Sequence, residues 1–175
     1  MKTLTCKAFA LASVLLATCA SPFTAGAQSE LTELNGEWRG SGTDRNSPFE
    51  SQQQTNCKST IRAEPVRMIS DAVCTGERGL HKVTHVAITL DGDQITGSID
   101  ETSSIAGSNE SPRILKGSVS GIRAGDTANL EIRFSGLMPK ATVIFKLISS
   151  SSYSTQASTL GVPITQVTYT RVGGR

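Results

Sequence analysis

The sequence predicts an all-β protein, an antiparallel up-and-down barrel or barrel-like sandwich of about eight to nine strands with one disulfide. Three observations support this fold class. Apolar and polar residues alternate at a period of two, turn-forming residues separate the alternating runs, and no window shows helical periodicity. A closed barrel also leaves no unpaired sheet edge exposed.

The N-terminal residues predict export. Lys2 and Lys7 precede an uncharged apolar run over residues 8–20, and residues 25–27 (Ala-Gly-Ala) offer the small side chains that a signal peptidase needs. The apolar run, about 13 residues long, is too short to span the roughly 30 Å core of a bilayer as a helix. We therefore expect residues 1–27 to be a signal peptide and the protein to be periplasmic or secreted.

Attachment to a membrane through a lipid is the alternative to free export. Residues 16–19 (Leu-Ala-Thr-Cys) are similar to a lipoprotein box, in which Cys19 would carry the lipid. Such a lipoprotein would be anchored to the membrane surface rather than released.

The remaining residues, 28–175, are expected to form a single domain of 148 residues. Two of the 17 basic residues lie in the predicted signal peptide, so 15 basic residues oppose 15 acidic ones and the formal charge is near zero. No basic field predicts binding to nucleic acid, and no apolar run in this domain predicts a transmembrane segment. Polar side chains on the outward parity disfavour an outer-membrane barrel, and these are Gln52, Gln54, Lys58, Lys116, Arg133 and Lys146.

Two cysteines remain in this domain, Cys57 and Cys74. In an exported protein such a pair most simply forms one disulfide, which here closes a loop of about 18 residues. The spacing differs from the C-x-x-C of redox and metal sites, so a structural role is favoured.

The predicted strands cover residues 36–43, 53–62, 66–75, 80–90, 94–101, 113–121, 127–135, 140–149 and 163–172. Glycines open the first strand, and the cysteine pair is expected to join the second strand to the third. Asp91-Gly92 is a strong tight-turn signal between the fourth strand and the fifth. Alternation places one set of apolar side chains inward, namely Leu80, Val86, Ile88, Leu90, Ile95, Ile99, Leu130, Ile132 and Phe134.

Polar segments separate the later strands. Residues 102–112 are rich in Ser, Gly and Asn and predict a loop, and residues 123–126 predict the turn of the next hairpin. Met138-Pro139 turns the chain into the strand that begins at residue 140. The serine run of residues 149–152 is expected to open a second flexible loop before the last strand.

One strand is apolar on both parities. Over residues 141–148, Val143 and Phe145 are expected to face the interior, which leaves Ile144 and Ile148 outward. This outward pair is expected to pack under residues 28–35 or to form a protein contact, and packing is favoured.

The sequence offers no convincing metal site. His81 and His85 would share a face on a helix, but on a strand they lie about 13 Å apart and point into solvent or the lumen. Asp91 and Asp93 flank a turn glycine without the six or more oxygens that calcium needs. Neither a metal nor another cofactor is expected.

Catalytic residues are not predicted either. Residues 117–121 (Gly-Ser-Val-Ser-Gly) have Val119 at the centre, so they do not match the nucleophile elbow G-x-S-x-G. Asp100 and Glu101 are neighbours on a strand, so they point to opposite faces and cannot act as an acid–base pair. The protein is therefore expected not to be an enzyme.

Gly36-Glu37-Trp38 near the start of the domain, together with Arg171 in the last strand, resembles the pattern of the calycins. This group includes lipocalins, avidin-like proteins and small bacterial inhibitors of secreted metalloproteases. The resemblance implies that Trp38 closes one end of the barrel and that Arg171 packs across the indole.

A second resemblance covers the whole domain. The pattern Gly36-x-Trp38-x-Gly40, the two cysteines and the segment 117–121 are similar to a group of small exported proteins of Gram-negative bacteria. This likeness implies export and a disulfide, and it brings no activity with it.

Two functions follow as expectations. The first is an exported, non-enzymatic binding protein or envelope accessory factor, whose barrel is filled or holds a small apolar ligand. The alternative is an inhibitor of a secreted protease, which would insert its free N-terminal segment, residues 28–31, into the enzyme.

Overall fold

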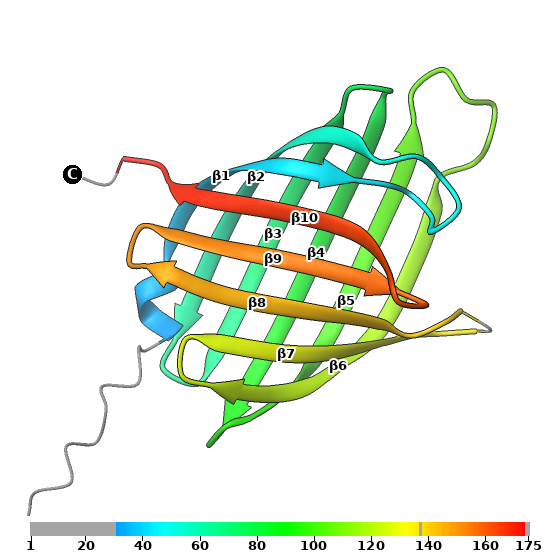
Figure 1. Cartoon of the computed structure of the whole chain (residues 1–175). Helices are drawn as coiled ribbons and strands as arrows, with labels where there is room; N and C mark the ends of the chain where they lie inside the picture. Colours follow the sequence, from blue (N-terminus) through cyan, green and yellow to red (C-terminus); the bar gives the residue numbers. More distant parts are fainter. Residues whose placement is uncertain (1–30, 137, 174–175) are drawn as a thin grey trace, which may run out of the picture.

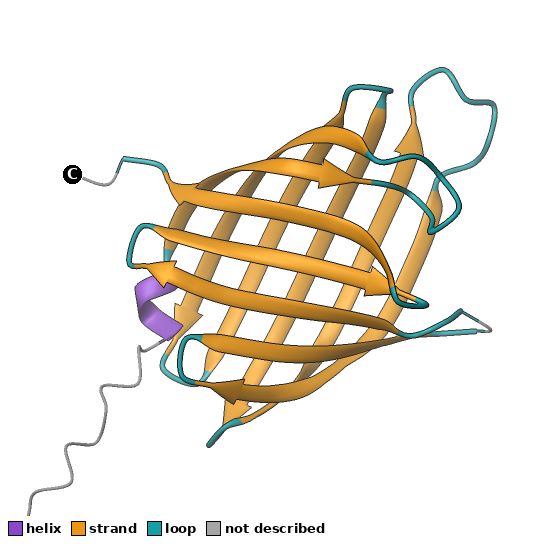
Figure 2. Ribbon diagram, viewed as in Figure 1, coloured by secondary structure: helices purple, strands orange, loops and turns teal. Residues whose placement is uncertain are grey.

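The computed structural model describes residues 31–136 and 138–173, so the predicted signal peptide and Cys19 lie outside the described residues. A short 3-10 helix precedes a run of strands (Figure 1, Figure 2). The elements are η1 (Leu31–Leu34), β1 (Gly36–Asp44), β2 (Gln53–Glu64), β3 (Arg67–Gly76), β4 (Leu80–Asp91), β5 (Gln94–Ile105), β6 (Arg113–Ala124), β7 (Thr127–Phe134), β8 (Ala141–Ser149), β9 (Ser152–Thr159) and β10 (Val162–Arg171).

The strands form one closed barrel in which every strand pairs with its sequence neighbours. Each pairing is antiparallel, and β1 also pairs with β10, which closes the barrel. The predicted antiparallel up-and-down barrel is therefore confirmed. The described residues contain ten strands rather than the predicted eight to nine.

The additional strand is β9, which was expected to be part of a flexible loop. Its sequence (Ser-Tyr-Ser-Thr-Gln-Ala-Ser-Thr) has only Tyr153 and Ala157 between threonines on the inward parity, so the alternation that marks a half-buried strand is weak. Serine and threonine are tolerated on either face once both neighbours supply hydrogen bonds, and here β8 and β10 do so. The expectation of a loop was wrong because Ser149 ends β8, Ser152 begins β9, and only residues 150–151 form the turn between them.

Two apolar clusters lie inside the barrel. The first cluster surrounds Trp38 at the end of the barrel that η1 occupies. The second is formed by inward side chains of β4 to β8. The second cluster contains Ile88, Ile95, Ile99, Val119, Ile132 and Ala141. Each of these side chains has the inward parity of its strand, as the alternation of the sequence predicts for most of them.

The predicted disulfide is confirmed. Cys57 and Cys74 are directly opposite each other in the pairing of β2 with β3, and their sulfur atoms are bonded. Both side chains are buried in the cluster around Trp38. The bond therefore joins the two strands from inside the barrel.

We predict that replacing both cysteines (Cys57→Ala with Cys74→Ala) lowers the free energy of unfolding by about 3 kcal/mol, because a closed loop of about 18 residues is released in the unfolded chain. Urea denaturation monitored by circular dichroism measures this difference. A loss well below 1 kcal/mol would show that the strand pairing alone restrains this segment.

Candidate functional site

Trp38 and Arg171 meet at one end of the barrel. They are cross-strand partners between β1 and β10, and the guanidinium carbon of Arg171 lies 4.3 Å from the centre of the indole ring. The indole nitrogen donates to the carbonyl oxygen of Leu34 at 2.9 Å. The guanidinium donates to the carbonyl oxygens of Glu33 and Asn35. These bonds attach η1 to the barrel, and we call this end, formed by η1, Trp38 and Arg171, the floor.

Two glycines of β1 make room for the floor. Gly36 has φ of 133°, and a Cβ there would lie 2.9 Å from Nη1 of Arg171. A Cβ at Gly40 would lie 2.7 Å from the ring of Tyr169. The spacing of Gly36, Trp38 and Gly40 therefore has a steric reason in this barrel.

Aromatic rings continue from Trp38 into the lumen. Tyr153 contacts Trp38 edge to face with ring centres 4.8 Å apart, and it stacks on Phe145 at 5.0 Å and on Tyr169 at 4.6 Å. Burial raises the pKa of both phenols, that of Tyr169 to about 12, so both are neutral at pH 7. Tyr153 comes from β9, so the strand that was not predicted supplies the centre of this stack.

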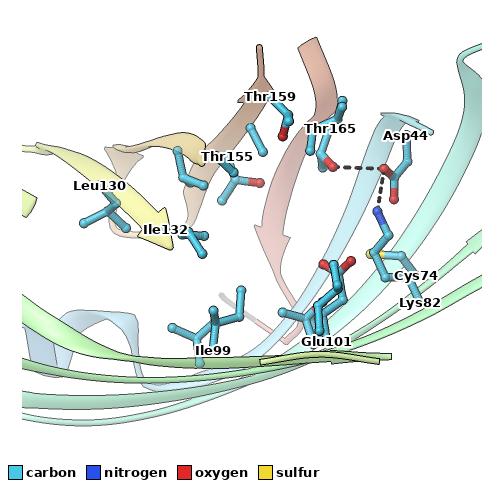
Figure 3. A pocket seen from close by; sticks show the side chains of 18 of the residues that line it. Asp44, Cys74, Lys82, Ile99, Glu101, Leu130, Ile132, Thr155, Thr159 and Thr165 are labelled. Carbon is cyan, nitrogen blue, oxygen red and sulfur yellow. Dashed lines mark hydrogen bonds and ion pairs between the residues drawn. The ribbon is translucent and has the colours of Figure 1, made fainter. Parts of the chain in front are cut away.

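Beyond the aromatic rings lies a cavity of about 260 Å³ (Figure 3). Its walls are mainly apolar side chains that β2 to β9 direct inward. Among them are Ile61, Met68, Val86, Ile99, Leu115, Val119, Leu130, Ile132, Phe134, Val143, Phe145 and Ala157. Residues 45–48 of the β1–β2 loop and residues 138–139 of the β7–β8 loop border the cavity at the end opposite the floor, which we call the mouth.

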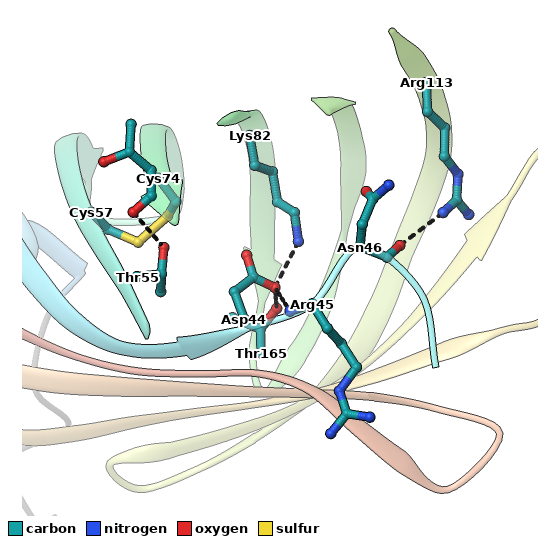
Figure 4. Close-up of polar contacts among 10 residues, drawn as sticks. Asp44, Arg45, Asn46, Thr55, Cys57, Cys74, Lys82, Arg113 and Thr165 are labelled. Carbon is teal, nitrogen blue, oxygen red and sulfur yellow. Dashed lines mark hydrogen bonds and ion pairs between the residues drawn. A yellow bond between two sulfur atoms is a disulfide. The ribbon is translucent and has the colours of Figure 1, made fainter. Parts of the chain in front are cut away.

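A buried ion pair lies near the mouth. Asp44 has no solvent exposure, and its Oδ1 accepts from Nζ of Lys82 at 2.8 Å and from Oγ1 of Thr165 at 2.9 Å (Figure 3, Figure 4). The backbone nitrogen of Arg45 donates to the same oxygen at 2.8 Å. Among the described residues, no group donates to Oδ2 of Asp44, which is also buried.

A second carboxyl group lines the cavity beside this pair. Glu101 interacts electrostatically with Lys82, Asp44 and Arg113. Burial raises the pKa of Glu101, and the opposing attraction of Lys82 does not cancel this effect. Ser103, directly opposite Lys82 in the β4–β5 pairing, is buried, and its hydroxyl has no partner in the described part of the chain.

The polar residues of the cavity were not predicted as a site, although alternation marks them. Lys82 has the parity of Leu80, and Glu101 has the parity of Ile99, so each belongs to the inward face of its strand. Asp44 likewise shares the inward parity of Trp38. The apolar residues of each inward face do not by themselves mark these charged residues as part of a site.

The outward pair of β8 remains uncovered. Ile144 and Ile148 are 43% and 55% exposed. The expected packing under the N-terminal segment was wrong for its described part, because Leu34 of η1 is buried in the cluster around Trp38. A protein contact through Ile144 and Ile148 stays a prediction.

The two histidines and the two aspartates of the Asp91-Gly92-Asp93 turn lie on the surface. His81 and His85 are exposed on the outer face of β4, and Asp91 and Asp93 lie at the β4–β5 turn. No group of three or more His, Cys, Asp or Glu residues in the described ranges is arranged to hold a metal ion. Within the same ranges, no helix has the length and apolar composition to cross a membrane.

Comparisons with protein-family models, with curated proteins and with solved structures found no match to this chain.

We predict that Lys82→Met lowers the free energy of unfolding by about 3–5 kcal/mol, because Asp44 would stay buried without its cation. The double replacement Asp44→Leu with Lys82→Met should lose less, since no charge is then left unpaired. Lys116→Met is the matched control, because its ion pair with Asp100 is exposed on the outer face and contributes little. Urea denaturation of the variants measures the differences; equal losses for Lys82→Met and Lys116→Met would contradict the prediction.

We also predict a pH-dependent gain in stability for Glu101→Gln. Because the pKa of Glu101 is raised in the folded state, its contribution to stability is complete below the unfolded value of 4.5 and is lost as the pH rises through the folded value. The free energy of unfolding of Glu101→Gln relative to wild type should therefore be higher at pH 7 than at pH 4. Denaturation at both pH values measures this, and an unchanged difference would show that ionisation of Glu101 is not opposed by the fold.

Proposed function

We propose that this protein is an exported, non-enzymatic binding protein that holds a small, mainly apolar ligand inside its barrel. The cavity of about 260 Å³ carries the proposal. Its apolar walls and few convergent polar groups are the usual composition of a ligand site. Export rests on the N-terminal sequence and its signal peptide pattern.

The volume of the cavity limits the ligand. An engineered cavity of about 150 Å³ holds benzene, whereas sites for drug-sized molecules begin at about 300 Å³. A cavity of about 260 Å³ therefore suits a molecule larger than benzene and smaller than most drugs. An aromatic ring with a short side chain is of this size.

The arrangement of the two barrel ends favours entry at the mouth. At the floor, η1 is fixed by Trp38 and Arg171, and the aromatic rings around Tyr153 fill the lumen above them. A smaller cavity of about 80 Å³ lies beside η1, near the β6–β7 turn. At the mouth, loop residues 45–48 border the main cavity directly.

The resemblance to calycins agrees with a ligand-binding role, because closed antiparallel barrels of this kind hold ligands in the lumen. The alternative that the sequence left open, inhibition of a secreted protease, requires residues 28–31 to enter an enzyme. Leu31 belongs to η1 and packs against the cluster around Trp38, while residues 28–30 lie outside the described residues. Binding in the cavity is therefore the function we favour.

We predict that the uncharged fluorophore N-phenyl-1-naphthylamine binds the protein with an increase in fluorescence. Ala157→Phe, which places a ring in the cavity, should weaken this binding by at least about tenfold, because the added side chain occupies ligand space. Circular dichroism first verifies that each variant is folded, and fluorescence titration then measures its affinity for the fluorophore.

Ala87→Phe is the matched control, because Ala87 has the outward parity of β4 and does not line the cavity. It should bind the fluorophore as wild type does. Absence of binding to wild type, or equal binding by the two variants, would contradict a ligand site in the barrel.

A further inference from the structure

The cavity has chemically different ends. Near the floor it is walled by aliphatic and aromatic side chains, among them Phe145 and Tyr153. Near the mouth it is walled by Asp44, Lys82 and Glu101, with Thr165 beside them (Figure 3). A ligand that fills the whole cavity must therefore have an apolar body and a polar head.

Asp44 identifies what the polar head must provide. Its Oδ1 already accepts three hydrogen bonds, from Lys82, Thr165 and the backbone of Arg45. Its Oδ2 is buried and has no donor among the described residues, although a carboxylate oxygen accepts only and is costly to bury unpaired. A completely buried side chain on the cavity wall thus lacks one donor.

Glu101 lacks donors as well. It lines the same part of the cavity, and no hydrogen bond or ion pair within the described ranges reaches its carboxyl group. The Ser103 hydroxyl, on the same strand and face, is buried without a partner in the described chain. The carboxyl oxygens of Asp44 and Glu101 are therefore the acceptors that this part of the cavity wall presents.

The three cations near the mouth each contact another group of the protein, although Nε of Arg45 is buried and has no acceptor in the described part of the chain. Lys82 is paired with Asp44 at 2.8 Å. Arg113 donates to the carbonyl oxygen of Asn46 at 3.0 Å (Figure 4). Arg45 donates to the carbonyl oxygen of Glu50 at 3.0 Å, and Figure 4 shows its guanidinium directed away from the contact between Asp44 and Lys82.

From these contacts we propose that the ligand is an amphipathic amine, whose ammonium group donates to Asp44 and Glu101 while its apolar body lies against the aliphatic and aromatic walls. An ammonium group offers three hydrogen-bond donors and a positive charge. The two carboxyl groups, which share one lysine between them, can accept hydrogen bonds from these donors and attract the positive charge. An anionic head would also lie beside these two acidic side chains, while Lys82 and Arg113 are already bonded within the protein. This inference rests on the proposed binding function and specifies the class of ligand for the same cavity.

Three probes with one apolar body test the proposal. 4-Phenylbutylamine, 4-phenylbutan-1-ol and 5-phenylpentanoate carry the same phenyl ring and four methylenes and differ only in the head, and the amine is protonated at pH 7 as a lysine side chain is. Each is titrated against wild-type protein carrying N-phenyl-1-naphthylamine, and displacement of the fluorophore gives the affinity. The amine should bind at least about tenfold more tightly than either the alcohol or the acid.

A variant connects this preference to the named carboxyl group. Glu101→Gln should remove most of the advantage of the amine over the alcohol, because the variant loses one acceptor carboxyl group while the apolar walls stay the same. Glu37→Gln is the matched control, since Glu37 is exposed on the outer face of β1, and it should keep the full preference.

The outcomes separate the ligand class from the binding function. If the fluorophore binds but the acid or the alcohol matches the amine, or if Glu101→Gln keeps the preference for the amine, the proposed ligand class is wrong and the cavity function stands. If neither the fluorophore nor any of the three probes binds to wild-type protein, both proposals are wrong.

Discussion

Closure of the barrel by the pairing of β1 with β10 is the constraint on which the rest of the structure depends. This pairing places Trp38 opposite Arg171, so the strand that begins the barrel and the strand that ends it meet at the indole. Arg171 then holds the carbonyl oxygens of η1, which fixes the floor. The same register brings Thr165 to Asp44 at the other end of β1. One strand pairing therefore positions both the floor and the polar part of the cavity.

Partners surround the most deeply buried charge of the lumen. Asp44 is fully buried, and it is compensated by Lys82 of β4, by Thr165 of β10 and by a backbone N–H group. A buried ion pair is weak evidence for stability, because desolvation offsets its attraction. Apolar residues of similar size would fill this space at lower cost in free energy. The presence of Asp44, Lys82 and Glu101 at the cavity wall is consistent with the ligand-binding role that we propose.

The two ends of the barrel differ in how the lumen is filled. The disulfide and the rings around Tyr153 occupy the floor end, where the remaining cavity beside η1 is only about 80 Å³. The cavity begins where the inward side chains become aliphatic and shorter, and it ends at carboxyl, hydroxyl and ammonium groups. A ten-stranded closed sheet of this kind thus supplies a rigid apolar wall with one polar end.

The sequence by itself determined the antiparallel barrel, the position of nearly all strands and the cysteine pair, because these depend on alternation, turn residues and redox context that are local to the chain. The alternation in the sequence also places Lys82 on the same inward face as Leu80, and Glu101 on the same inward face as Ile99. Only the tertiary structure decided that β9 is a strand, since its polar residues form one only when β8 and β10 offer hydrogen bonds on both sides. It alone brought Asp44 to Lys82 across 38 residues and left a cavity beside them, because contacts between distant strands depend on closure and on side-chain volumes that no local pattern encodes.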